Sequence, residues 1–297
     1  MDITQIRHFV RVAETGSYIK AADLLNVAQS TLSRQVRALE VELRASLFYR
    51  HGRGVLPTEA GKKFLEYARA TLHTIDSAVI AVRDSEASYS GQLVLGMPNS
   101  VGRICLSTVV PRLMERFPRA SISVIESMSS ALYQGVLLGH IDFAFVHNPT
   151  ASPNIRILPV ASDELYLIGP RPAGPDPDRV RLAELAHVPL ILPHGNHAVR
   201  VAVETAAARQ GVTANIALQV DAFYPSIELV AKGLGYSIMP GMLEKAARLP
   251  SLSWQKITDP VLENATCMVL PSQPARNPLH ADAAELVRST LIEILAR

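Results

Sequence analysis

The chain has 297 residues, enough for about two domains, because domains usually hold roughly 100–200 residues each. Hydrophobic residues make up 48% of the sequence and charged residues 19%, which is enough apolar material for packed cores and excludes global disorder. The formal net charge is only +2, so any basic surface for a nucleic-acid partner must be local.

Membrane segments, targeting signals and cysteine frameworks are not expected. The sequence contains no apolar run of about 18 residues, so we expect no transmembrane helix and no membrane partner. Asp2 and the arginines within the first apolar segment are unlike a signal peptide, which favours a cytoplasmic protein. The two cysteines, Cys105 and Cys267, are too few for a disulfide framework or a cysteine-rich zinc site, and we expect both thiols to be buried.

Residues 1–57 are predicted to form three short helices followed by a hairpin. Gly16 suits a left-handed cap at the end of the first helix, and Ser17 suits the start of the second, at 18–25. The third helix begins near Gln29 and turns an apolar face inward, formed by Leu32, Val36, Leu39 and Leu43. Two helices joined by a short turn, the second with a polar and arginine-rich outer face, are typical of a helix-turn-helix.

The candidates for nucleic-acid contact lie on the third helix and on the hairpin. Residues 29–53 hold five arginines and two acids, a charge of +3, and residues 47–57 are predicted to form a hairpin with a glycine-rich, basic tip, a wing. A basic cluster of this size is also common on a solvated helix face, so the helix-turn-helix context decides its meaning. Glutamine and arginine can pair with base edges, whereas arginines on phosphates position a protein without reading sequence. Candidates for base contacts are Gln29, Ser30, Thr31, Ser33 (for which a phosphate contact is equally open) and Arg34; candidates for phosphate or minor-groove contacts are Arg37, Arg50 and Arg53.

Residues 58–88 are predicted to form one long helix with Thr58 as its N-cap. A narrow apolar seam with heptad spacing runs along it, formed by Leu65, Ala68, Leu72, Ile75, Val79 and Val82. Such a seam favours pairing with a second helix, and so dimerisation. The alternative is that the helix packs on its own domain. Residues 85–91 lose the periodicity and are expected to form a hinge.

Residues 92–297 alternate predicted strands and helices, which favours an α/β fold with a parallel sheet. Strands are expected at 92–98, 121–126, 141–147, 165–169, 188–192, 215–220, 235–240 and 265–270. Helices are expected at 103–117, 129–138, 198–210, 225–233, 241–247 and 279–296.

Four segments carry a resemblance to a known family: residues 9–61, GQLVLGMPNS (91–100), GHIDFAF (139–145) and GLGYSIMP (233–240). On these segments the chain resembles LysR-type transcriptional regulators over its whole length, most strongly at its N-terminal end. Within the family it is similar to the nitrogen-assimilation-control-like subgroup. One departure is Ser30, where many members carry proline. Serine also tolerates a helix N-terminus, so we expect DNA binding to be kept and the base contacts to differ.

The resemblance implies a winged helix-turn-helix DNA-binding domain at 1–57 and a linker with a dimerisation helix and hinge at 58–90. It also implies a C-terminal effector domain of two α/β lobes, like a periplasmic binding protein. Lobe one would hold 91–161 and 267–297, and lobe two 162–266. The implied assembly is a homotetramer, a dimer of dimers, on double-stranded DNA with a dyad-symmetric site. RNA polymerase is the further partner that the resemblance implies.

A small anionic effector is expected between the two lobes. A helix N-terminus suits an anion, and Asn99-Ser100-Val101-Gly102 opens a helix directly after a strand. The resemblance places Ser129 at the same cleft, and an ordinary N-cap is the alternative for both serines. It also places an effector contact in the loop that holds Asn196 and His197, and His147 at the end of the strand 141–147 completes the candidates. For each of these histidines, an ordinary surface position is equally open.

The loop histidines raise two further possibilities. His194 and His197 could form a metal pair, but no third ligand is apparent nearby, so neither a metal nor a cofactor is expected. Histidines that line the cleft would make effector binding sensitive to pH near about 6–7.

The sequence thus predicts a DNA-binding transcriptional regulator gated by a small, anionic metabolite, and not an enzyme. Three alternatives stay open: a regulator of the same family controlled by its abundance without an effector, a solute-binding protein, and a DNA-linked enzyme. The sequence has no G-x-S-x-G, H-E-x-x-H, Walker or C-x-x-C motif, which opposes an enzyme. The first 88 residues oppose a solute-binding protein, because such a protein needs no helix-turn-helix.

Overall fold

The computed structural model describes residues 1–52, 54–83, 89–175, 177–244, 251–273 and 277–296. It divides into two compact units, one holding residues 1–86 and the other most of residues 87–297. Within the described residues, no helix combines the length and the apolar character needed to cross a membrane.

The first unit contains the three short helices, the hairpin and the long helix that the sequence predicts. Its elements are α1 (Ile3–Thr15), α2 (Tyr18–Leu25), α3 (Gln29–Leu43), β1 (Phe48–His51), β2 (Gly54–Pro57) and α4 (Glu59–Arg83). Gly16 ends α1 in the left-handed region at φ 61°, and the Ser17 hydroxyl caps α2 by accepting from the Lys20 N–H. The Thr58 hydroxyl accepts from the Gly61 N–H at 3.0 Å, which confirms the predicted cap of the long helix.

A cluster of aromatic rings forms the centre of the first unit. Phe9 of α1 is fully buried, and its ring centroid lies 5.1 Å from that of Phe48 and 5.0 Å from that of Phe64. The wing is tied to the turn between α1 and α2, because the Val55 N–H donates to the Gly16 carbonyl at 2.9 Å. A Cβ at Gly54 would overlap that same carbonyl oxygen, so only glycine fits at this position, where β2 leaves the turn of the wing.

The first half of α4 belongs to this core. Ala68 is only 2% exposed, and Leu65 and Leu72 pack on the same buried cluster as Phe9. This is intrachain packing, the alternative that the heptad pattern left open for these positions. Ile75 is half-buried and Val79 is 42% exposed, whereas the side chain of Val82 lies outside the described part of the chain. The predicted hinge also falls mostly on residues that are not described.

Glu40 closes the junction between α3 and the wing. One of its carboxylate oxygens accepts from the backbone N–H of Leu47 at 2.7 Å and of Phe48 at 3.2 Å. Replacing Glu40 by alanine should cost about 1–3 kcal/mol of unfolding free energy, because both N–H groups lose a charged acceptor beside a buried core. Chemical denaturation followed by circular dichroism measures this cost. Glu66→Ala, at an exposed glutamate of α4, is the control, and an equal effect of both changes would contradict the role of Glu40.

The second unit is a ten-stranded mixed sheet with helices against it. Its strands are β3 (Gly91–Met97), β4 (Ala120–Glu126), β5 (Phe143–His147), β6 (Ile155–Pro170), β7 (Arg179–Arg181), β8 (Leu190–Leu192), β9 (Ile216–Gln219), β10 (Tyr236–Pro240), β11 (Leu252–Thr258) and β12 (Glu263–Pro271). Its helices are α5 (Asn99–Arg116), α6 (Ser129–Leu137), α7 (Ala198–Arg209), α8 (Phe223–Ala231) and α9 (Pro278–Leu295), with short 3-10 helices at Leu182–His187 and Gly241–Leu243.

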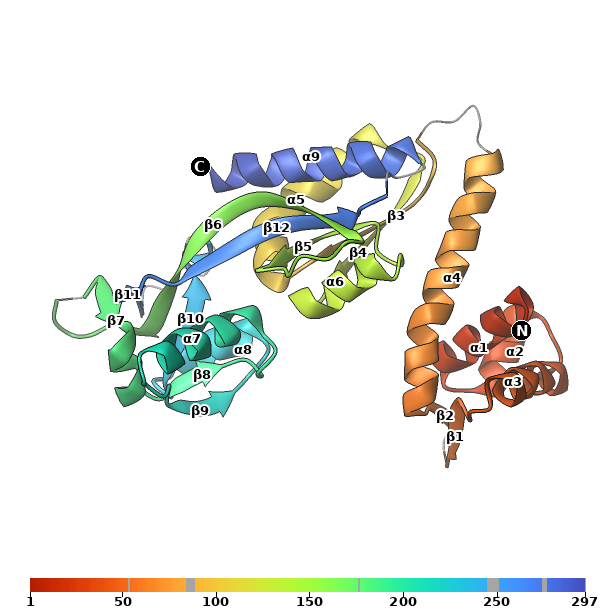
Figure 1. Ribbon diagram of the computed structural model, residues 1–297, viewed down its shortest axis with the longest axis horizontal. Coiled ribbons are helices and arrows are strands. Elements are labelled where there is room, and N and C mark those ends of the chain that lie inside the picture. The colour runs from red at the N-terminus through yellow and green to blue at the C-terminus, as the bar shows by residue number, and fades with distance from the viewer. Residues whose placement is uncertain (53, 84–88, 176, 245–250, 274–276, 297) are drawn as a thin grey trace. The chain divides into compact units, whose positions relative to one another are not determined.

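Two long antiparallel strands join the halves of this sheet (Figure 1). β6 and β12 pair from Glu164 opposite Glu263 to Ile155 opposite Pro271. The parallel pairs expected from the alternating pattern lie on either side, with β3 beside β4 and β5, and β8 beside β9 and β10. The expectation of a parallel sheet is therefore wrong for the centre, where β6 and β12 pair antiparallel with each other and with neighbouring strands.

Each half of the sheet has its own apolar core. One core packs α5 and α9 on β3 and β5, and includes Leu93, Phe117, Phe143 and Leu291. Another packs α7 on β8 and the end of β6, and includes Leu167, Leu190 and Val203. The two halves therefore carry separate hydrophobic cores while sharing the strands that run between them.

Candidate functional site

The outer face of α3 carries the predicted contact residues of the first unit. Gln29, Ser30, Arg34 and Arg37 are exposed, and Thr31 and Ser33 are half-buried. No side chain caps α3 at Ala28, so the helix begins with backbone N–H groups that a phosphate could accept from. The arrangement presents short polar side chains at the start of a helix and arginines one and two turns later.

A concave surface of about 790 Å³ joins α3 to the wing. It is lined by Gln29, Ser33 and Arg37 of α3 together with Arg44 and His51. Arg53 and the side chain of Arg50 lie outside the described part of the chain, so their predicted phosphate contacts stay predictions. The described lining holds two arginines, Arg37 in the second half of α3 and Arg44 at its C-terminal end, and this surface suits a polyanion.

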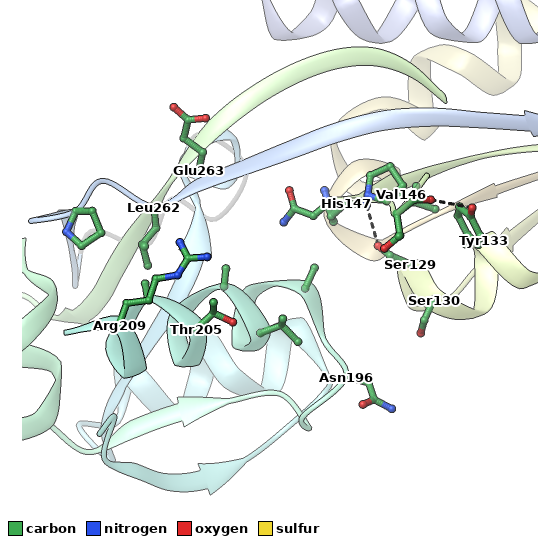
Figure 2. Close-up of a pocket in the computed structure, with 18 of the residues that line it drawn as sticks. Ser129, Ser130, Tyr133, Val146, His147, Asn196, Thr205, Arg209, Leu262 and Glu263 are labelled. Atoms are coloured by element: carbon green, nitrogen blue, oxygen red, sulfur yellow. Dashed lines mark hydrogen bonds between the residues drawn. The ribbon is translucent and has the colours of Figure 1, made fainter. Parts of the chain in front are cut away.

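Two adjoining pockets, of about 900 and 500 Å³, lie in the second unit and share Ser129, His147, Asn196 and Ala198. Figure 2 shows the larger pocket, with Ser129, Tyr133 and His147 facing Thr205 and Arg209 of α7. Ser100, at the start of α5, lines the smaller pocket. Volumes of this size are typical of small-molecule sites. The smaller pocket is lined mainly by loops and helix starts from the two halves of the sheet, and the larger pocket is lined along the length of α7.

His147, at the end of β5, links the two serines. Its Nε2 lies 2.8 Å from Ser100 Oγ, and its backbone N–H donates to Ser129 Oγ at 3.0 Å. Burial lowers the pKa of His147 to about 4, and the neighbouring His197 adds to the shift. His147 is therefore neutral near pH 6–7, so it gives no basis for pH-sensitive effector binding there.

Some of the other predicted effector residues line a pocket and some do not. Asn196 lines both pockets, and Asn99 lines the smaller one, where its amide donates to Glu126 at 2.5 Å. Val101 and Gly102 are buried and line neither pocket, and their N–H groups donate to the Pro98 carbonyl. Two of the backbone donors in the segment that the sequence assigned to an anion are therefore used within the helix.

His197 lines the smaller pocket and also caps α7. Its Nδ1 accepts from the Val199 N–H at 3.3 Å, so this ring nitrogen carries no proton, and burial lowers the pKa of His197. His194 instead forms a contact with Asp221 at 2.9 Å. Among the described residues, no group of three or more histidine, cysteine or acidic side chains is arranged to hold a metal ion.

Several pocket residues were not predicted from the sequence. Phe223 and Tyr224, at the start of α8, line the smaller pocket, and the Arg103 guanidinium lies 4.3 Å from the Tyr224 ring centroid. The aromatic pair that follows the strand at 216–219 after three residues was a usable signal. Asn264 and Thr266 of β12, which contact His147, carried no such signal because they sit in a strand far along the chain.

Both cysteines are buried, as expected. Burial raises the pKa of the Cys105 thiol to about 12 and also raises the pKa of Cys267. Both thiols therefore stay protonated and behave as small apolar side chains.

The fold and these two surfaces define a helix-turn-helix unit joined to an α/β unit whose pockets have the size of small-molecule sites. Residues 3–62 match the family described as bacterial regulatory helix-turn-helix protein, lysR family, and residues 86–292 match the LysR substrate binding domain. The chain belongs to the LysR family of bacterial transcriptional regulators and is a DNA-binding regulator rather than an enzyme.

Known relatives agree with this assignment. The nitrogen assimilation regulatory protein nac of Klebsiella aerogenes is 26% identical over 299 residues, which span all of this chain and 96% of the relative. The crystal structure of CbnR, a LysR family transcriptional regulator, is 26% identical with a TM-score of 0.72, covering 98% of this chain and 99% of that one. Full-length CbnR complexed with its target DNA matches with a TM-score of 0.69 at 26% identity, over 98% of this chain and 100% of that one. The resemblance to the nitrogen assimilation regulators is therefore confirmed.

Proposed function

We propose that this protein is a transcriptional regulator gated by a small anionic metabolite bound in the smaller pocket. The observation that carries the proposal is the pair of serine hydroxyls, Ser100 and Ser129, held by His147 at the starts of α5 and α6. Asn196 and His197 from the other half of the sheet complete the lining. A ligand that contacts both halves would stabilise one arrangement of the two lobes, which we assign to 91–161 with 267–297 and to 162–266. The effector acts only through its different affinity for the two states.

The DNA-binding unit is proposed to act in the cytoplasm as part of a dimer of dimers. Two α3 helices would lie in successive major grooves of a dyad-symmetric site, about one helical turn apart. Ile75, Val79 and Val82, in the second half of α4, are the seam positions that we assign to pairing between chains. Leu65, Ala68 and Leu72 keep their place in the intrachain core. Ligand-driven rearrangement would then change how the bound tetramer bends DNA and meets RNA polymerase.

The thermal midpoint of the purified protein tests effector gating. We expect a shift of several degrees with one class among small carboxylates, aromatic acids and amino acids, because a ligand that binds only the folded state stabilises it. Ser100→Ala should remove most of that shift while leaving DNA affinity unchanged. Ser107→Ala, at an exposed serine on the same helix, is the matched control.

Two results would contradict the proposal. An unchanged dose–response in Ser100→Ala would return Ser100 to an ordinary position at a helix end. A flat response of the wild type to the whole panel would favour a regulator controlled by its abundance.

A further inference from the structure

A buried polar network lies directly behind Ser100. Asn264 and Thr266 are fully buried, and His147 is 6% exposed. The Nδ1 atom of His147 lies 3.1 Å from Asn264 Nδ2 and 3.1 Å from Thr266 Oγ1. Buried polar groups need complementary partners, so the direction of each hydrogen bond in this network matters.

The direction is set by a backbone group that can only donate. The Ala265 N–H donates to Asn148 Oδ1 at 2.8 Å, which fixes the orientation of the Asn148 amide. Asn148 Nδ2 then donates to Asn264 Oδ1 at 3.2 Å, which fixes the Asn264 amide in turn. Asn264 therefore presents its NH2 group, a donor, to His147 Nδ1.

Because Asn264 donates, His147 must accept with a lone pair on Nδ1 and carry its proton on Nε2. The opposite tautomer would set an N–H of His147 against the NH2 group of Asn264, two donors 3.1 Å apart in a buried site. The Thr266 hydroxyl can rotate to donate as well. The Nε2–H of His147 consequently donates to Ser100 Oγ.

In this arrangement the hydroxyl groups of Ser100 and Ser129 can both donate a hydrogen bond to a ligand. Ser100 Oγ accepts from His147 Nε2, and Ser129 Oγ accepts from the His147 backbone N–H, so each hydroxyl proton is available to a ligand. The two carboxylates that line the same pocket already have donor partners. Glu126 accepts from the Asn99 amide, and Asp221 accepts from the His194 backbone N–H.

We propose that the relay from Asn148 through Asn264 and His147 orients Ser100, and that with Ser129 it makes the pocket select a hydrogen-bond acceptor such as a carboxylate over an ammonium group. Asn148, Asn264 and Thr266 are positioning residues in this scheme, since they act on a ligand only through His147. The inference rests on the proposed effector function, whose ligand is anionic, and adds the residues that orient the hydroxyl donor for that ligand.

The tautomer of His147 tests the relay without any ligand. Nitrogen NMR of full-length protein labelled with ¹⁵N-histidine distinguishes a protonated from an unprotonated ring nitrogen, and the resonances that His147→Gln removes identify this ring. We expect the proton on Nε2 in the wild type. Asn264→Asp should move it to Nδ1, because a carboxylate can accept both from Asn148 and from the ring. Asn154→Asp, at an exposed asparagine, should leave the tautomer unchanged. A wild-type proton on Nδ1 would overturn the relay.

Ligand selection is tested with benzoate and benzylamine, a matched pair that suits the aromatic lining and differs in the polar group. Wild-type protein should show a thermal shift with benzoate and none with benzylamine, and Asn264→Asp should weaken benzoate binding about tenfold or more. Equal shifts with both compounds would overturn the selection. If neither benzoate nor any acid of the wider panel binds while the proton is found on Nε2, the relay stands and the proposed effector function fails.

Discussion

Replacing Phe9 by alanine should lower the unfolding free energy of the first unit by about 3–5 kcal/mol, because the side chain is fully buried between Phe48 and Phe64. The two units give separate signals. Trp254, the single tryptophan, lies in β11 of the second unit, so its fluorescence reports on that unit. Circular dichroism reports on the helices of both. We expect an early transition to appear in circular dichroism while the Trp254 transition keeps its midpoint.

The matched control is Ile19→Ala on α2, where the side chain is 67% exposed. A surface change of this kind usually alters stability by less than about 0.5 kcal/mol. A Phe9→Ala protein that unfolds in the same transition as the wild type would contradict the central role of the aromatic cluster. So would an equal loss of stability in Ile19→Ala.

Arg34→Ala should weaken binding to the protein's own DNA site by roughly 5- to 150-fold, the equivalent of about 1–3 kcal/mol for one bidentate base contact. Arg34 is exposed on α3, one turn after the polar residues at its start. The site is obtained by selecting from a pool of random duplexes with wild-type protein. Affinity for an unselected duplex at the same salt concentration gives the non-specific reference.

Arg37→Ala is the comparison, because Arg37 is assigned to a phosphate. It should weaken binding to both duplexes by a similar factor and make the salt dependence of binding less steep. If Arg34→Ala also weakens both duplexes equally, Arg34 contacts the DNA backbone and does not read a base.

The first unit was predictable from sequence because its signals are local. Gly16 and Ser17 end one helix and start the next through contacts within a few residues, and α1 ends and α2 begins where those signals place them. The heptad seam is also a local pattern, but the pattern does not show whether the seam packs on a second chain or on its own domain. The structure covers Leu65, Ala68 and Leu72 with α1 and the rest of its core.

The centre of the second unit was the least predictable part. The apolar pattern predicted only 165–169 as a strand, whereas β6 runs from Ile155 to Pro170. Pro159 and the polar run at 162–164 interrupt the apolar pattern, and the strand is held instead by antiparallel pairing with β12. The sequence pattern also missed β7 and β11, which are held by pairing with distant strands. β11 pairs with β6, and β7 pairs with β11.

The same long-range pairing assembles the network behind Ser100. Thr266 lies opposite His147 in the β5–β12 register, 119 positions along the chain, and Asn264 follows from the same strand. Serine at a helix start is visible in a sequence, and so is a histidine at the end of a strand. Which residues hold that histidine is decided by strand register, which the sequence pattern does not reveal.

The packing of α4 on α1 makes the long helix a lever rather than a flexible tether. The ring of Phe64 against Phe9, the buried Ala68 and the ion pair of Arg69 with Glu14 bind α4 to the body that carries α3. A rotation of α4 therefore also rotates α3, whose outer face carries the predicted DNA contacts. A helix of 25 residues spans about 37 Å at about 1.5 Å per residue. A tilt of about 10° then moves one end by roughly 6 Å relative to the other, close to two base-pair steps of DNA. If the protein binds the dyad-symmetric site proposed above, small angular changes at the far end of α4 would be large enough to change the half-site spacing that it fits.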